Sequence, residues 1–139
     1  MVRLHNYQSA ARRHLEDAES LLSAGRCDNA AYLAGYAAEC GVKALAELVG
    51  QPLPKLHLHQ LSSDVLEAAL AAVGGFRRYP GARAAFMGAL AKWTTSMRYD
   101  ATGTADVPHA NRLVKESRNV FAATIGALVL DGVLMEVPR

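Results

Sequence analysis

Apolar residues recur at helical spacing along most of this sequence, and they are densest between Asp28 and Gly50. Plotted at about 100° per residue, that stretch is apolar around almost its whole circumference. One arc of it holds Leu33, Ala37, Cys40, Ala44 and Leu48. A helix that is apolar on nearly all sides belongs in the middle of a bundle. The pattern therefore predicts a buried central helix here, with other helices packed around it.

A single polar line interrupts this central segment. It consists of Tyr32, Tyr36, Glu39 and Lys43, whose spacing returns them to one side of a helix. Polar groups on a buried helix need partners or water. One interpretation is a Glu39–Lys43 pair one turn apart, with the tyrosines covering the core. The other is a cleft opposite Arg98 and Tyr99, in which Glu39 bridges to Arg98 and Lys43 is available to a phosphate.

The flanking segments predict further helices. The amphipathic pattern of residues 5–24, followed by Gly25, indicates a first helix that forms an antiparallel hairpin with the central one. Asp28 is the expected N-cap of the central helix, which Gly50–Pro54 should end. His14 falls inside the apolar stripe of the first helix, where a packed histidine is expected.

The rest of the chain predicts two shorter helices and a long closing one. The short helices cover residues 64–73 and 82–95, and the second should bury Phe86, Leu90 and Trp93. The closing helix should begin near Pro108, be capped by Asp106 and end at Asp131–Gly132. The expected architecture is an all-α, four- or five-helix up-down bundle. It should form a single domain over residues 1–139.

Charge is unevenly distributed. The 139 residues carry a formal net charge of +2, too small by itself to indicate nucleic-acid binding. However, no acidic residue occurs between Glu67 and Asp100. Five cations lie there among aromatic residues: Arg77, Arg78, Arg83, Lys92 and Arg98. This segment can hold single-stranded nucleic acid by charge and stacking, or its arginines can simply cover a solvated surface.

Other classes of site are not indicated. Cys27 and Cys40 form neither a disulfide framework nor a zinc motif, and Cys40 is expected to be a reduced thiol in the core. His57 and His59 lack the companions of a metal site. There is no apolar run of 18 residues and no signal-peptide pattern, so we expect a cytoplasmic protein without a metal or cofactor.

Three stretches resemble the HEPN domain family of helical bundles. They are the opening hairpin with its tyrosine-rich second helix, the phrase KLHLHQL with His59 and Leu61, and WTTSMRYD with Trp93, Arg98 and Tyr99. The resemblance implies a dimer, association with a nucleotidyltransferase, and in many members metal-independent RNA cleavage. That activity implies an Arg followed four to six residues later by a His. Arg98 is followed by its first His at His109, and neither Arg112 nor Arg118 has the spacing.

The resulting hypothesis is a homodimeric binding module rather than a stand-alone catalyst. It would act with a nucleotidyltransferase partner, or bind nucleotide or RNA, through the polar line, Arg98 and Tyr99. The first alternative is a divergent ribonuclease toxin of a toxin–antitoxin pair that uses Arg98 with His59 or His109. The second is a purely structural partner subunit.

Overall fold

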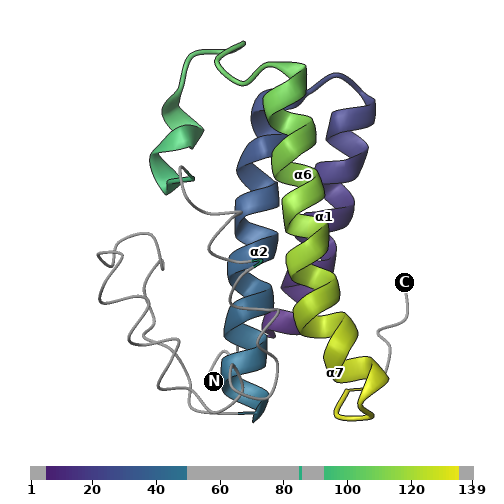
Figure 1. Cartoon of the computed structure of the whole chain (residues 1–139). Coiled ribbons are helices and arrows are strands. Elements are labelled where there is room, and N and C mark those ends of the chain that lie inside the picture. The colour runs from purple at the N-terminus through teal and green to yellow at the C-terminus, as the bar shows by residue number, and fades with distance from the viewer. Residues whose placement is uncertain (1–5, 50–84, 86–92, 135–139) are drawn as a thin grey trace.

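Three long helical segments lie side by side in the computed structural model, which describes residues 6–49, 85 and 93–134 (Figure 1). The elements are α1 (Tyr7–Ser23), α2 (Cys27–Val49), the 3-10 helix η2 (Thr95–Tyr99), α6 (Val107–Phe121), the π-helical turn η3 (Ala122–Gly126) and α7 (Ala127–Leu130). α2 and α6 run in the same direction and α1 runs against both (Figure 1). The predicted all-α class is confirmed, because every regular element of the described part is helical.

α1 and α2 form the predicted antiparallel hairpin. Asn6 caps α1 by accepting a 2.9 Å hydrogen bond from the backbone of Ser9. α1 buries its small and branched residues Ala11, Leu15 and Ala18. Gly25, with a φ of 77°, occupies the left-handed region that lets the chain reverse after the helix.

The prediction that Asp28 caps α2 is wrong, because α2 already begins at Cys27. The Asp28 carboxylate instead accepts backbone hydrogen bonds from Gly103 (2.8 Å) and Ala105 (2.9 Å). These bonds, Gly103 first, lower the pKa of Asp28. Asp28 therefore fastens the loop before α6 to the start of α2, which a reading of local spacing cannot show.

α2 and α6 pack closely because small residues meet between them. The Ser117 hydroxyl, buried at 1% exposure, donates a 2.7 Å hydrogen bond to the Ala34 carbonyl. At Gly41, an added Cβ would lie 2.7 Å from Thr124 Oγ1. The helices can therefore approach at this level only with glycine on α2.

The closing helix begins and ends where predicted. Asp106 caps α6 by accepting a 2.9 Å hydrogen bond from the backbone of His109. The helix continues through η3 and α7 to Leu130, and Gly132, at a φ of 74°, follows. Within η3 the Thr124 hydroxyl donates to the Val120 carbonyl at 2.7 Å, which satisfies the hydroxyl where the helix widens. No helix among these elements is both long and apolar enough to cross a bilayer.

Two predicted elements lie wholly or mostly outside the described residues, namely the short helix 64–73 and most of the helix 82–95. The predicted end of that last helix is wrong: Trp93 and Thr94 are not helical, and η2 starts at Thr95. The burial of Trp93 is confirmed.

The contact between Gly41 and Thr124 predicts opposite effects for two glycine substitutions. We expect Gly41→Ala to destabilise the protein by about 1–3 kcal/mol, because its methyl group overpacks a buried hydroxyl. Gly126→Ala should instead stabilise by about 0.5–1 kcal/mol, since its Cβ would meet only ordinary contacts of 3.7 Å or more. Urea denaturation of the two variants tests this, and equal shifts in the midpoint would contradict the packing described.

Candidate functional site

Four rings from three segments form an aromatic cluster, which we define as His14 of α1, Tyr32 and Tyr36 of α2, and Trp93. Tyr32 lies edge-on to Tyr36 with centroids 5.1 Å apart, and Trp93 lies edge-on to Tyr36 at 5.0 Å. Trp93 stacks on Tyr32 at 6.1 Å, and the His14 ring is 5.8 Å from Tyr36. Edge-on and stacked pairs at such distances are favourable beyond the area they bury.

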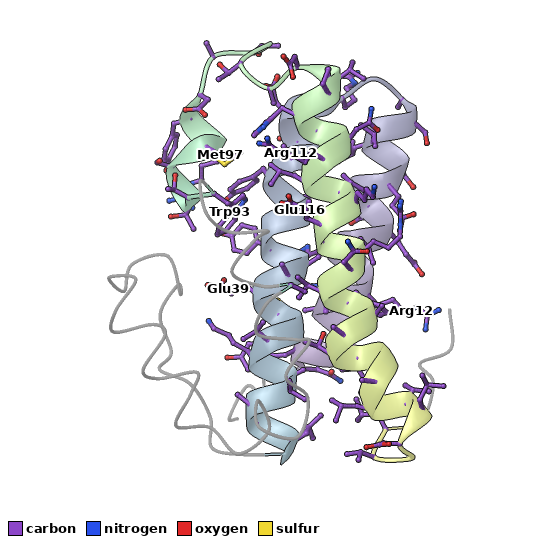
Figure 2. The ribbon with its side chains drawn as sticks, in the orientation of Figure 1. Arg12, Glu39, Trp93, Met97, Arg112 and Glu116 are labelled. Atoms are coloured by element: carbon purple, nitrogen blue, oxygen red, sulfur yellow. The ribbon has the colours of Figure 1, made fainter. Side chains whose placement is uncertain are left out.

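Trp93 is held against the backbone of α2. Its indole Nε1 donates a 3.0 Å hydrogen bond to the Tyr32 carbonyl, and the side chain is only 1% exposed. A Cβ on Gly35 would lie 2.0 Å from the indole nitrogen, so only glycine lets the ring lie on the helix here. In Figure 2, Trp93 and Glu39 lie along the same side of α2, with Glu39 further toward its C-terminal end.

The two phenols of the cluster are coupled. The Tyr32 hydroxyl donates to the Tyr36 hydroxyl at 3.1 Å. Burial, followed by this hydrogen bond, raises the pKa of Tyr36 well above its usual value. The Tyr36 hydroxyl therefore stays a neutral hydrogen-bonding group at physiological pH, which suits a binding surface better than an acid or base.

Arg98 and Tyr99 lie at the exposed end of η2. The guanidinium carbon of Arg98 is 4.8 Å from the centroid of the Tyr99 ring, which is the geometry of a cation–π pair. The Tyr99 residue is 78% exposed. Tyr99 raises the pKa of Arg98 most and Tyr32 adds to that effect.

Glu39 and Lys43 continue the polar line away from Arg98. Glu39 is only 3% exposed, and its charge helps to raise the pKa of Tyr36 and of Cys40; burial is the larger cause for both. The Cys40 pKa reaches about 11, so that free thiol stays protonated. The Lys43 ammonium lies 5.7 Å from the centroid of the Tyr7 ring on α1.

The expected bridge from Glu39 to Arg98 is not formed among the described residues, where Arg98 interacts with Tyr99 and Tyr32. Arg98 is exposed on η2, whereas Glu39 is buried on α2, and the charges of both influence the pKa of Tyr36.

Of the residues named for a possible ribonuclease, Arg98 and His109 lie in the described part of the chain. The Arg112 guanidinium contacts His109 Nδ1 at 3.2 Å, and since arginine can only donate, this contact needs the imidazole proton on Nε2. His109 also lines a small cavity of 150 Å³ with Asp28, Met97 and Asp100. His57, His59 and the cations Arg77, Arg78, Arg83 and Lys92 lie outside the described residues. Within them, no cluster of His, Cys, Asp or Glu could hold a metal ion.

The role of Gly35 was not expected from the sequence. An isolated glycine inside a strongly helical pattern is a signal of close packing. Its partner could not be inferred, since Trp93 lies 58 positions further along the chain. His14 was expected to be packed, but its place beside Tyr36 likewise depends on how α1 lies against α2.

A helical bundle with a partly buried aromatic cluster and an exposed arginine–tyrosine pair is thus the class of protein that the structure defines. The family model of the HEPN domain matches residues 6–126. The chain therefore belongs to the HEPN domain family. No curated protein and no solved structure matches it.

The closeness of Gly35 to Trp93 can be tested by fluorescence, because Trp93 is the only tryptophan of the chain. We expect Gly35→Ala to push the indole off α2, which should shift its emission to longer wavelength and cost about 1–3 kcal/mol of stability. Gly126→Ala, remote from the ring, is the control and should leave the emission unchanged. An unaltered spectrum of folded Gly35→Ala would contradict the contact.

Because of His14, we expect the free energy of unfolding to decrease as the pH falls. Burial first, and then the charge of Arg13, lower its pKa below the ordinary value of 6.5. The unfolded chain then binds more protons than the folded one below about pH 7, so stability falls with falling pH by at most about 1.4 kcal/mol per unit. His14→Gln should make the free energy of unfolding, measured by urea denaturation, depend less on pH between pH 7 and pH 5. An identical slope in the variant would exclude His14 as its cause.

Proposed function

We propose that this HEPN chain is a binding module that holds a nucleotide or single-stranded RNA at Arg98 and Tyr99. The observation that supports this most directly is the 78% exposure of the Tyr99 ring, with the Arg98 guanidinium 4.8 Å from its centroid. Large exposed aromatic rings beside a cation are the groups on which bases stack and to which phosphates bind. The pair lies at the end of a short helix that the buried Trp93 connects to α2.

Each part of the site has a separate role in this proposal. A base stacks on Tyr99, and the planar guanidinium of Arg98 contacts the adjoining phosphate. The aromatic cluster supports the pair, because Tyr32 helps to raise the pKa of Arg98 and is itself hydrogen-bonded to Tyr36. Glu39, being buried, acts on this cluster through its charge and does not contact the ligand from the surface.

Lys43 would serve an extended ligand. Eleven residues separate it from Tyr32, a rise of about 16 Å along α2. A mononucleotide cannot span that distance, whereas about five stacked nucleotides at ~3.4 Å each can. The proposed basic patch of Arg77, Arg78, Arg83 and Lys92 would add further phosphate contacts to such a strand.

The same proposal includes a homodimer and a nucleotidyltransferase partner. Family membership supports both. The sequence lacks an Arg followed by a His at four to six residues, which favours a chain that binds over one that cleaves. A binding subunit of this kind would deliver or position RNA or nucleotide for the catalytic protein.

Removal of the exposed ring should weaken binding strongly. We expect Tyr99→Ala to raise the Kd for a fluorescent single-stranded RNA about 5- to 150-fold, because a stacked base contributes about 1–3 kcal/mol. Tyr99→Trp should preserve binding, and Arg98→Ala should both weaken it and reduce its dependence on salt. Fluorescence anisotropy measures all three, with Arg118→Ala as the matched control. That exposed arginine pairs with Glu19, on the α1 side of the bundle.

Three outcomes would overturn the proposal. Equal affinities of Tyr99→Ala and the unchanged protein would remove the stacking site. Cleavage of total RNA in the presence of chelator, lost in Arg98→Ala, would establish the ribonuclease alternative. Absence of any RNA or nucleotide binding, together with stoichiometric co-purification of another protein, would establish a structural subunit.

A further inference from the structure

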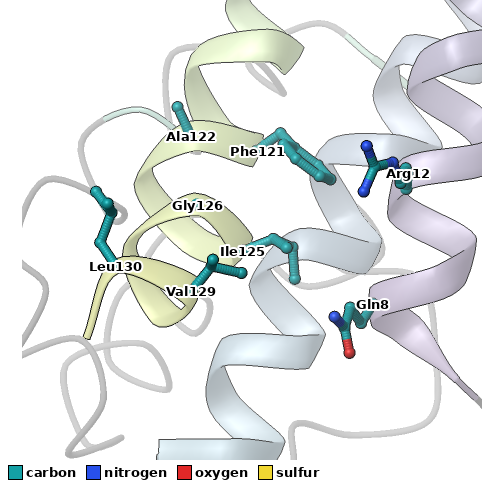
Figure 3. A pocket seen from close by; sticks show the side chains of 8 residues that line it. All are labelled: Gln8, Arg12, Phe121, Ala122, Ile125, Gly126, Val129 and Leu130. Carbon is teal, nitrogen blue, oxygen red and sulfur yellow. The ribbon is translucent and has the colours of Figure 1, made fainter. Parts of the chain in front are cut away.

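A groove of 360 Å³ lies on another part of the bundle, between α1 and the end of the closing helix. Gln8 and Arg12 of α1 form one wall, and Phe121, Ile125 and Val129 form the other (Figure 3). Gly126 also lines it. It shares no residue with the aromatic cluster or with Arg98 and Tyr99, so its occupant is independent of the proposed function.

The groove is formed by the sizes of the side chains around the π-helical turn. Phe121, Ile125 and Val129 recur every four residues and make one apolar ridge that spans η3. Beside it, Ala122 and Gly126 are too small to fill the adjoining space. π-helical turns occur often at functional sites, and here one keeps an apolar hollow open that a leucine at either small position would occupy.

Within the part of the chain that the structure describes, the polar side chains that line the groove belong to α1. The guanidinium of Arg12 lies beside the Phe121 ring, and the Gln8 amide lies one turn away (Figure 3). The Arg12 Nε donates to Glu16 at 3.2 Å, which fixes the direction of the planar group. Arginine stays charged at every physiological pH and matches a carboxylate in shape. The groove thus combines an apolar wall with an anion-binding wall.

The volume of the groove suits a small molecule. The volume lies within the range of ligand pockets, and at about 30 Å³ per water-sized group it holds roughly a dozen non-hydrogen atoms. We propose that this groove binds a medium-chain carboxylate, with its chain along Phe121, Ile125 and Val129 and its head at Arg12 and Gln8.

The probe for this site is octanoate, with 1-octanol as the uncharged molecule of the same chain length. Titration of the full chain, followed by amide NMR shifts, should give a Kd on the order of 0.1–1 mM for octanoate, with shifts that centre on the groove. Gly126→Leu should abolish binding of both probes by filling the space. That variant should fold, because a Cβ there meets only ordinary contacts and leucine favours helix more than glycine does.

Substitutions of two neighbouring arginines distinguish binding of the carboxylate head group from the general effect of removing a positive charge. Arg12→Gln should weaken octanoate at least about fivefold and leave 1-octanol unchanged, since only the head group loses its partner. Arg13→Gln, an exposed position that does not line the groove, should alter neither. Octanoate binding that survives Gly126→Leu, or no shift of groove amides at all, would overturn the proposal. A change of oligomeric state in Gly126→Leu would also overturn it, because the groove would then be an interface between copies.

Discussion

The contact between the Trp93 indole and the backbone of α2 at Gly35 organises the described part of this protein. The hydrogen bond from the indole Nε1 to the Tyr32 carbonyl fixes the ring in direction as well as in position. The ring in turn brings Tyr32 and Tyr36 together from the side and anchors the chain that leads into η2. Because a side chain on Gly35 would overlap the indole, the whole arrangement depends on one missing Cβ.

α2 meets different neighbours through small residues on different sides. Gly41 and Ala34 let α6 approach, with Ser117 and Thr124 supplying hydroxyls that are bonded to backbone carbonyls. Gly35 accepts Trp93. The tight α2–α6 interface carries packing, whereas the aromatic side holds the exposed Arg98–Tyr99 pair in place. The proposed binding site on η2 needs such a buried support, since the helix itself buries no residue.

Much of the fold could be predicted from periodicity and end signals, because these are local properties. The hairpin, the Asp106 cap and the stop at Asp131–Gly132 depend on residues within a few positions of each other. The predictions that were wrong concern residues that contact a segment distant in the sequence. Asp28 has the residue type of a cap, but it bonds to the loop at Gly103 and Ala105.

By itself, the sequence determined that the chain is helical, that α2 is its central helix and that Tyr32, Tyr36, Glu39 and Lys43 share one side of it. Helical geometry dictates these from spacing alone. Only the tertiary structure decided that Arg98 lies beside Tyr99 at the exposed end of η2, that His14 and Trp93 complete an aromatic cluster, and that a groove opens beside η3. Those features depend on how helices distant in sequence lie against each other, which is set by small residues and buried contacts that no local pattern encodes.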